Sequence, residues 1–440
     1  MEIAYIPVGV PTFDLDEAQD KFIKSQKMLR ELFPAVTVPS EMLLSIDKLC
    51  AFLSSIHPDL VILQNITFAN AEYASEVLSH TDCPVVLWTL REPDGNGGRL
   101  RLNSLTGAFS AGNAMHALGR PRFEYVFGAP DEKGTKDEIR AAIEGIRIKK
   151  QLEELTIAAV GYTPQGFGFG RALDADVRRT FGSRLVSIEA RELIKKADTY
   201  SVQDIESYRK ELKEKCSGIE NMPPENIERY LRLRKAYNDF VTENKIGALA
   251  SRCWPDFFTE YKTPVCAVLS MLNDGGIPSA CEGDLYGALS MYIACELNHG
   301  PVFFGDPVAM DEKKNTITYW HCGMAAPSLA VKAELGVHPN RKIGPVMDFG
   351  CKASDAASVL RVGRKTDGTF RLFIASGKIL NAPKQYQGTS VVFQPAESAE
   401  MIIRKTVKDG WEPHYVVAPS EITAAASCLA EFLGIEVCRF

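Results

Sequence analysis

PDLVILQN (residues 58–65) decides the fold class, because it is a short apolar run of strand length bounded by turn-forming residues. Similar runs come before and after it, EIAYIPVG (2–9) and CPVVLWTL (83–90), and an amphipathic stretch at 16–33 separates the first two. Strands that alternate with helices in this way are typical of a parallel α/β sheet. The polar segment EPDGNGG (92–98) follows the third run, so we expect it to be a loop at the carboxyl edge of the sheet and a rim of a ligand site.

A second unit with the same pattern follows the charged helix that the sequence predicts over 135–155. It starts with the strand TIAAVGY (156–162) and continues through a glycine-rich turn and a helical region over 202–244 to two more apolar strands. Because strands and helices alternate again, we expect a second parallel sheet.

After about residue 300 the pattern changes to many short β segments separated by turn residues, which favours an antiparallel sheet or barrel. The sequence therefore predicts an α/β protein with three parts. Two doubly wound parallel-sheet domains occupy 1–150 and 151–300, and a β-rich domain, an antiparallel sheet or barrel, occupies 301–440.

Composition narrows the classes of partner. The 440 residues carry a formal net charge of -6, so there is no basic field for a nucleic acid, and a small molecule is the expected partner. The 11 cysteines are scattered and include no C-x-x-C pair, which is typical of reduced thiols in the cytoplasm. No stretch approaches the roughly 18 apolar residues of a membrane span, and the N-terminus lacks the basic start of a secretion signal. We therefore expect a cytoplasmic protein without a membrane partner.

Three glycines, Gly166, Gly168 and Gly170, follow the strand at 156–162 and suggest a dinucleotide or phosphate site, because glycines let backbone approach a pyrophosphate. Their spacing is G-x-G-x-G rather than G-x-G-x-x-G. A flexible turn is the better interpretation, and a nicotinamide oxidoreductase is the weakest of the alternatives.

Two carboxylates stand at the ends of apolar strands. Glu282 follows IPSAC and Asp306 follows PVFFG, and a carboxylate that ends a buried strand is unfavourable unless its charge is compensated. Asp284 has a simpler interpretation, since it stands where it would cap the helix that begins at Leu285. A divalent cation such as Mn²⁺ is one way to compensate Glu282 and Asp306.

An imidazole would complete such a site. Two of the seven histidines flank predicted strands of the last part, His321 in TYWHC and His414 in EPHYVV. Spacing alone does not choose between them. The other five lie in predicted turns, helix ends or an isolated cleft position, and they are His57, His80, His116, His299 and His338.

The segment ACEGD (280–284), with the aspartate of FFGD 24 residues after its glutamate, resembles the L-fucose isomerase family and its L-arabinose isomerase relatives. In that family a glutamate in A-T-E-x-D, an aspartate in F-A-D and a histidine in W-P-N-H hold Mn²⁺. These positions fall here on Glu282, Asp306 and His414. The resemblance thus favours His414 over His321 as the third ligand, and it implies a homo-oligomer, a hexamer in the family. The family's Arg-rich loop after the first strand is absent, since this chain has PVGVPTFDLDE there.

The same resemblance implies an aldose-ketose isomerase that works through an enediol, with Glu282 and Asp306 as the acid/base pair and a divalent metal as the stabiliser of the enediolate. Trp254, Arg252, Trp320 and His321 end strands near these ligands in the sequence pattern and are candidate contacts for the sugar.

Two alternatives stay open. One is an isomerase of an anionic sugar, such as the sulfonated hexose sulfoquinovose, for which Arg91, Arg101 and Arg252 are candidate cations. The other is a non-catalytic sugar-binding protein, which would need no metal.

Overall fold

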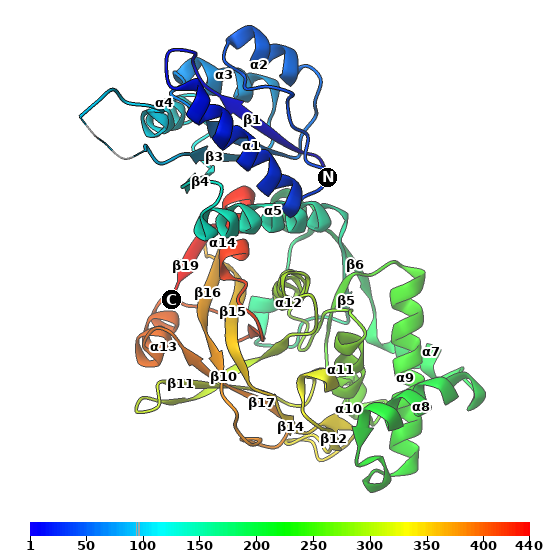
Figure 1. Cartoon of the computed structure of the whole chain (residues 1–440). Coiled ribbons are helices and arrows are strands. Elements are labelled where there is room, and N and C mark those ends of the chain that lie inside the picture. The colour runs from blue at the N-terminus through cyan, green and yellow to red at the C-terminus, as the bar shows by residue number, and fades with distance from the viewer. Residues whose placement is uncertain (94, 96) are drawn as a thin grey trace. The chain divides into compact units, whose positions relative to one another are not determined.

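The computed structural model describes residues 1–440 except 94 and 96, so the predicted loop at 92–98 lies partly outside the described residues. The chain forms two compact units (Figure 1). Unit 1 comprises Met1–Lys150 with Ala424–Gly434, and unit 2 comprises Gln151–Thr423 with Ile435–Phe440. The boundary predicted near residue 300 lies inside unit 2, and the division into three domains stays a prediction.

Unit 1 is built on a four-stranded parallel sheet in the order β1-β2-β3-β4, so the α/β prediction is confirmed. Its strands are β1 (Ile3–Val8), β2 (Leu60–Asn65), β3 (Val85–Thr89) and β4 (Glu124–Phe127). Its helices are α1 (Leu15–Leu32), α2 (Ile46–Leu53), α3 (Ala71–His80), α4 (Ser104–Ala117), α5 (Lys133–Glu154) and α14 (Thr423–Leu433).

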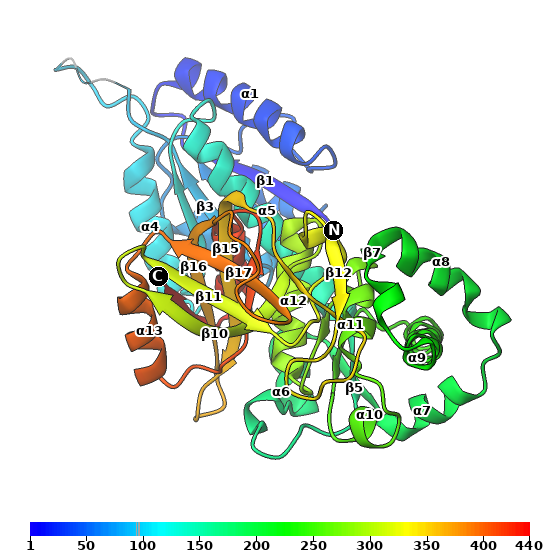
Figure 2. The same ribbon diagram turned by 90° about the horizontal axis from the view of Figure 1, so that it is seen from below.

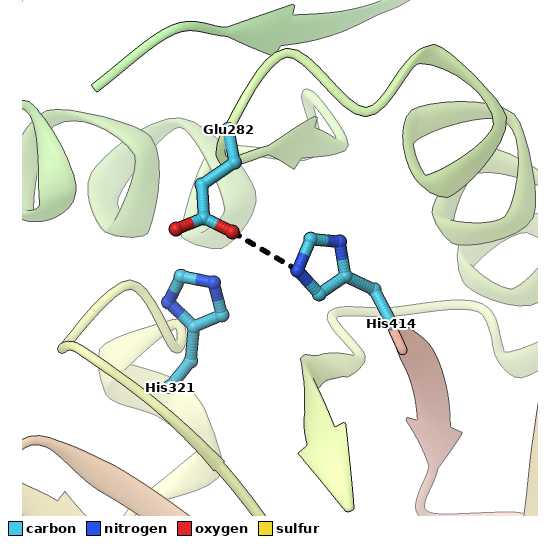
Figure 3. Close-up of side chains that lie close together, drawn as sticks. All are labelled: Glu282, His321 and His414. Atoms are coloured by element: carbon cyan, nitrogen blue, oxygen red, sulfur yellow. Dashed lines mark hydrogen bonds and ion pairs between the residues drawn. The ribbon is translucent and has the colours of Figure 1, made fainter. Parts of the chain in front are cut away.

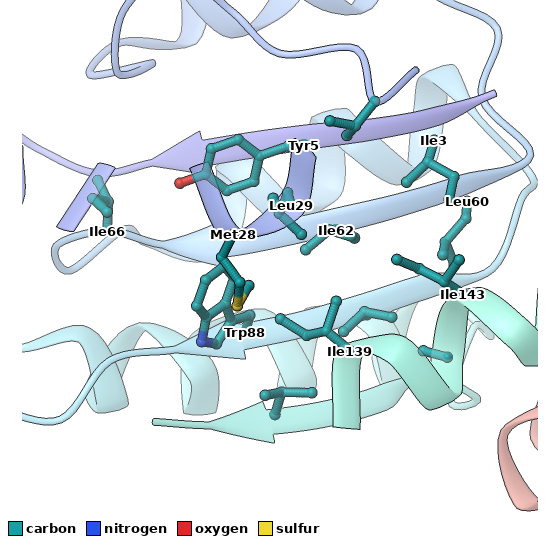
Figure 4. Packing of buried hydrophobic residues seen from close by; sticks show 14 of the residues in the cluster. Ile3, Tyr5, Met28, Leu29, Leu60, Ile62, Ile66, Trp88, Ile139 and Ile143 are labelled. Atoms are coloured by element: carbon teal, nitrogen blue, oxygen red, sulfur yellow. The ribbon is translucent and has the colours of Figure 1, made fainter. Parts of the chain in front are cut away.

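Helices cover both faces of this sheet. On one face Tyr5 and Trp88 pack with Met28 of α1 and Ile139 of α5, as Figure 4 shows, and Cys428 of α14 joins the same core. On the other face the apolar sides of α2, α3 and α4 bury the alternate strand residues. Both faces of every central strand are thus apolar, which is why these strands appear in the sequence as continuous hydrophobic runs.

Unit 2 contains a second parallel sheet in the order β6-β5-β8-β9. The strands are β5 (Thr156–Val160), β6 (Arg184–Ile188), β8 (Ala248–Ser251) and β9 (Ser279–Ala280). Because β6 and β8 lie on opposite sides of β5, the strand order reverses there, and ligands of such sheets bind outside the carboxyl ends of the strands at this point. The loops after β5, β8 and β9 all begin at that edge.

The remaining helices of this half are α6 (Asp174–Phe181), α7 (Ala190–Asp198), α8 (Glu206–Lys215), α9 (Pro224–Glu243), α10 (Asp256–Thr259) and α11 (Cys266–Asp274), with short 3₁₀ turns at Gly168–Gly170, Gln203–Ile205, Ile219–Asn221 and Pro327–Leu329. The single helical region predicted over 202–244 is wrong in its middle. The chain leaves the helix at β7 (Cys216–Ser217), Gly218 takes a left-handed φ of 85°, and Pro223 precedes the next helix. Glycine and proline both interrupt helices, which explains the break.

The rest of unit 2 is a barrel, one of the two β-rich architectures that the sequence predicts. Eight strands pair in the order β14-β17-β11-β10-β18-β15-β16-β19, and an additional pairing of β17 with β16 closes the ring from β17 to β16 (Figure 2). These strands are β10 (Phe303–Asp311), β11 (Thr316–His321), β14 (Phe349–Gly350), β15 (Ser354–Arg364), β16 (Phe370–Ile379), β17 (Thr389–Pro395), β18 (Tyr415–Ala418) and β19 (Glu436–Arg439). The short strand β12 (Ala333–Gly336) lies between β13 (Val346–Met347) and β7 and pairs with both, and α13 (Ala399–Lys408) packs beside β10.

Helix α12 (Leu285–Asn298) joins the two layers of unit 2. It lies between the barrel strands β15 and β18 and the parallel strands β5 and β8 (Figures 1 and 2). Its residues are buried on nearly all sides, as expected for a helix between two sheets. Since α12 begins directly after β9, its N-terminus fixes the loop that carries Glu282.

Within the described residues, no helix is long and apolar enough to cross a membrane.

Candidate metal and acid/base centre

Glu282, Asp306 and His414, the three ligands that the family resemblance implies, lie close together. Glu282 follows β9, Asp306 lies on β10, and His414 immediately precedes β18, which pairs with β10 in antiparallel fashion. The Nε2 atom of His414 lies 3.1 Å from Glu282 Oε2 and 3.4 Å from Asp306 Oδ1. Two carboxylates therefore face the same imidazole nitrogen.

The backbone at Glu282 is strained. Its φ is 59°, in the left-handed region, and Gly283 follows with 66°. A non-glycine residue in that region costs about 1–2 kcal/mol relative to its ordinary conformation. The Gly283 N–H donates to the Ser251 carbonyl of the neighbouring strand end, which holds the turn in place. Such strain is typical of functional positions, where the side chain is retained for its chemistry.

The tautomer of His414 follows from its other nitrogen. Nδ1 lies 2.9 Å from Asp284 Oδ2, and Asp284 accepts only, because Arg361 donates to both of its oxygens at 2.6 and 3.1 Å. Nδ1 therefore donates, and the lone pair of a neutral His414 is on Nε2, directed at Glu282 and Asp306. A carboxylate behind a ligating imidazole is the usual arrangement in metal sites.

His414 is buried, which disfavours its charged form, but its contacts with Asp284 and Glu282 outweigh burial and raise the pKa of the imidazole to about 9. In the chain alone, Nε2–H then donates to Glu282. A bound divalent cation would take the place of that proton between the same donor atoms.

His321 differs from His414 in the nitrogen that it presents. Its Nδ1 accepts the Cys322 backbone N–H at 2.9 Å, so the neutral ring carries its proton on Nε2. Burial lowers the pKa of His321 to about 4, so the ring is neutral near pH 7. A ligand atom of Glu282, one of His321 and one of His414 lie within 4.8 Å of one another (Figure 3). The hydrogen bonds thus favour His414 as a metal ligand and His321 as a hydrogen-bond donor beside it, a choice that spacing alone left open.

The donor set fits a hard divalent cation. Burial tends to raise the pKa of Glu282, but His414 outweighs this and the net shift is downward, whereas burial raises the pKa of Asp306 to about 6. In the part of the chain that the structure describes, no lysine or arginine forms an ion pair with either carboxylate. Two partly exposed carboxylates and one imidazole nitrogen are a suitable set for Mn²⁺ or a similar ion.

The predicted sugar contacts lie around this centre in different ways. The indole of Trp320 stacks near His321 at 6.5 Å between ring centroids, and Trp254 meets Phe167 edge-on. Arg252, however, is engaged with Asp256 at 2.6 Å. Its charge is therefore already compensated.

The glycine-rich turn forms part of the site, a role that the sequence did not predict. Phe169, between its glycines, lies edge-on to the His414 ring at 5.4 Å. A Cβ on Gly170 would lie 2.8 Å from the Asp284 Cα, so only glycine fits against that backbone. The turn therefore packs against the carboxylate–imidazole centre, and Gly170 has a structural reason that does not involve a dinucleotide.

Sequence reasoning also missed the role of Asp284 and of Arg361. Asp284 does cap α12, since its Oδ1 accepts the Gly287 N–H at 2.8 Å, as predicted, but it also holds His414. Arg361 lies within the strand ASVLRVGR, where an arginine in the middle of an apolar run is the one sign that the sequence offers.

The curated relatives that match this chain over nearly its whole length carry one name. No family model matches the chain. A sulfoquinovose isomerase from Clostridium sp. (strain MSTE9) is 55% identical over 99% of this chain and 98% of its own length. Those from Priestia megaterium (strain ATCC 12872 / QMB1551) and Alkalicoccus urumqiensis are 35% and 32% identical, over 99% and 96% of this chain and 98% and 96% of their own lengths.

Among solved structures, a glucose-galactose binding protein from Geobacillus stearothermophilus is 15% identical and covers 67% of this chain and 90% of its own, with a TM-score of 0.17. That likeness is too weak to bear on fold or function. The fold and the site define an α/β protein with a barrel and a buried carboxylate–imidazole centre. The identities over nearly full length show that the chain belongs to the sulfoquinovose isomerase family. The prediction of a carbohydrate isomerase is confirmed at this level, whereas the metal and the likeness to fucose isomerases stay predictions.

Proposed function

We propose that this chain interconverts sulfoquinovose, a hexose with a sulfonate at C6, and the corresponding 2-ketose, at a divalent metal held by Glu282, Asp306 and His414. The observation that carries this proposal is the convergence of the two carboxylates on His414 Nε2 at 3.1 and 3.4 Å. The name of relatives that match nearly the whole chain supports the anionic sugar over a neutral one.

The reaction moves a proton from C2 to C1 and another between the two oxygens, so it needs a base and an acid near both carbons. Glu282 and Asp306 are suited to this work because they face one point and no lysine or arginine of the described residues neutralises them. One takes the C2 proton and returns it at C1, while the other moves the hydroxyl proton. A divalent cation, when bound, supplies Lewis-acid stabilisation of the enediolate oxygens.

His321 supports this chemistry without titrating. Its proton is on Nε2, and the ring lies with Glu282 and His414 in one cluster, so it is suited to donate to a sugar oxygen. The stacked Trp320 fixes the plane of the His321 ring.

The test uses the purified full chain, stripped with a chelator and reloaded with Mn²⁺. It is incubated with sulfoquinovose in D₂O, and the ketose signals and deuterium at C1 or C2 are followed by NMR. Glu282→Gln and Asp306→Asn should each reduce turnover by at least about 10³-fold, because a general acid/base contributes about 10²–10⁴. Binding of the sugar without ketose formation would overturn the proposal in favour of a sugar-binding protein, and near-normal turnover in either variant would overturn the residue assignment.

On the resemblance to fucose isomerases, we also propose that the chain assembles as a homo-oligomer, and that it is a hexamer. Measurement of the mass of the native protein in solution tests this, and a monomer would contradict it. A cytoplasmic location stays a prediction from composition.

A further inference from the structure

The three arginines that the sequence offered for an anionic substituent already have carboxylate partners. Arg91 meets Glu132 at 2.9 Å, and Arg252 meets Asp256 at 2.6 Å. Arg101 pairs with two of the acidic residues at the start of α1, Asp14 and Glu17. An arginine that is already paired with a carboxylate has little positive charge left to bind a sulfonate, so another residue is the better candidate.

A turn after β12, His338–Ile343, is closed by its own backbone and by one imidazole. The His338 N–H donates to the Ile343 carbonyl, and the Lys342 N–H donates to the His338 carbonyl, both at 2.9 Å. His338 is buried, and its Nδ1 accepts the N–H groups of Asn340 and Arg341 at 3.3 and 3.2 Å. The turn is therefore fixed before any ligand arrives.

This turn presents two neighbouring cations, Arg341 and Lys342. In the part of the chain that the structure describes, neither forms an ion pair with a carboxylate. The Arg341 guanidinium instead lies over the rings of Trp254 and Phe258, at 5.9 and 5.8 Å from their centroids. Aromatic faces hold a guanidinium in place without cancelling its charge.

Two lines of contact lead from this turn to the acid/base centre. On one side Arg341 lies over Trp254, and Trp254 meets Phe167 of the glycine-rich turn. Phe167 in turn contacts Phe169, which lies against the His414 ring. On the other side Lys342 Nζ lies 3.5 Å from Gln387 Oε1.

That second line continues through the same glutamine. The Gln387 carbonyl accepts the Trp320 Nε1–H at 2.7 Å, and Trp320 stacks near His321. The turn thus lies between the two tryptophans that flank the centre.

We propose that Arg341, assisted by Lys342, binds the sulfonate of the sugar while its C1–C2 end lies at Glu282, Asp306 and His414. The inference rests on the proposed function and names the residue that selects the anionic hexose. A guanidinium suits this role because its parallel N–H groups match two oxygens of one tetrahedral anion. A neutral hexose would leave that charge without a partner, so the same residue both attracts the sulfonated sugar and gives no advantage to the neutral one.

The experiment compares Arg341→Gln, Arg341→Lys and Arg404→Gln in the Mn²⁺-loaded full chain, with sulfoquinovose and with glucose as substrates. Arg404 is the control, because it is an exposed arginine of α13 paired with Glu400. Loss of a charged hydrogen bond should lower kcat/KM for sulfoquinovose about 10- to 100-fold in Arg341→Gln, mainly through KM, and leave the small kcat/KM for glucose unchanged. Arg341→Lys should fall between, and Arg404→Gln should match the parent chain.

Arg171 provides the rival position, since its guanidinium also lies over an aromatic face, that of Tyr162 at 4.6 Å. If Arg171→Gln loses the preference for the sulfonated sugar and Arg341→Gln keeps it, the assignment is overturned. A direct readout that needs no turnover is the Mn²⁺ dissociation constant, which should stay the same in Arg341→Gln and would change if the substitution had damaged the centre. If the parent chain does not convert sulfoquinovose at all, the proposed function fails. If it does and Arg341→Gln is unaffected, only the sulfonate assignment fails.

Discussion

Arg361 and Asp284 form a bidentate ion pair, at 2.6 and 3.1 Å, in which both side chains are 0% exposed. A buried pair of this kind adds little net stability, because removing two charges from water offsets their attraction. Its consequence here is positional. The pair connects barrel strand β15 to the N-terminus of α12 and fixes an acceptor for His414 Nδ1. Between them they determine which nitrogen of His414 faces Glu282 and Asp306.

We expect Asp284→Asn to weaken the metal site without removing a ligand. The amide keeps the size of the side chain but is a weaker acceptor for the His414 Nδ1–H, and loss of such an outer contact typically lowers metal affinity about 10- to 100-fold. Titration of the chelator-stripped protein with Mn²⁺, followed by electron paramagnetic resonance, measures the change. Asp274→Asn is the matched control, because Asp274 is also a shielded, cation-paired aspartate but contacts Lys215 instead. Equal affinities in the two variants would contradict the positional role.

We expect Glu282→Gly to abolish turnover while the free energy of unfolding stays level or rises. The substitution relieves a φ of 59°, which is worth about 1–2 kcal/mol, and this gain offsets both the entropy that a glycine adds to the unfolded chain and the loss of the hydrogen bond from His414 Nε2–H. Urea unfolding of the metal-free protein provides the measurement. A loss of more than about 1 kcal/mol would show that Glu282 supports the fold itself.

His321→Gln and His414→Gln should have different effects, because the two rings present different nitrogens. Glutamine still offers an N–H donor in place of His321 Nε2–H, so Mn²⁺ affinity should persist there while kcat falls. In His414→Gln the lone pair toward Glu282 and Asp306 is lost, and Mn²⁺ affinity should fall by at least about 10-fold. Calorimetric titration with Mn²⁺ compares the two variants under one condition. A larger loss in His321→Gln would reverse the assignment of ligand and donor.

Removal of the metal should lower the midpoint of thermal unfolding. A ligand that binds only the folded state stabilises it by about 2.7 kcal/mol at one hundred times its dissociation constant, so the stripped chain should unfold at a lower temperature and recover with Mn²⁺. The double variant Glu282→Gln with Asp306→Asn should show no such recovery. If Mn²⁺ left the midpoint of the unmodified chain unchanged at saturating concentration, the carboxylate–imidazole centre would not be a metal site.

The amount of this structure that the sequence predicts depends on how local each feature is. The buried strands of unit 1 and the turns between the barrel strands follow from runs and turns of a few residues, and Glu282 stands directly after the apolar run of β9. Asp306, predicted at the end of a strand, lies instead inside β10, because the chain stays extended and paired with β11 as far as Asp311. The interruption of the helix over 202–244 was also present in the sequence, as Gly218 and Pro223, but the polar periodicity around them masked it.

The rest depends on contacts between residues far apart in the chain. Arg361 is 77 positions from Asp284, and His414 is 130 positions from it, so no short pattern connects the three. For the same reason the sequence does not distinguish an open antiparallel sheet from a closed barrel, since the two differ only in the pairing of β17 with β16. The sequence does not single out Arg341 and Lys342, because their relevant property is that neither forms an ion pair with a carboxylate, and ion pairs become visible only in the folded structure.

Helix α14 belongs to unit 1 but is synthesised last, so it bears on how unit 1 completes its core during synthesis. Cys428 of that helix belongs to the same core as Tyr5 and Trp88, and a Cβ on Gly145 of α5 would lie 2.9 Å from the Leu429 backbone nitrogen. A ribosome that has released the first 150 residues has therefore not yet delivered everything that unit 1 packs against. We therefore expect one apolar face of α5 to stay uncovered until residues 424–434 have been synthesised, after nearly all of unit 2. A chaperone that protects nascent chains would have its longest task at this face.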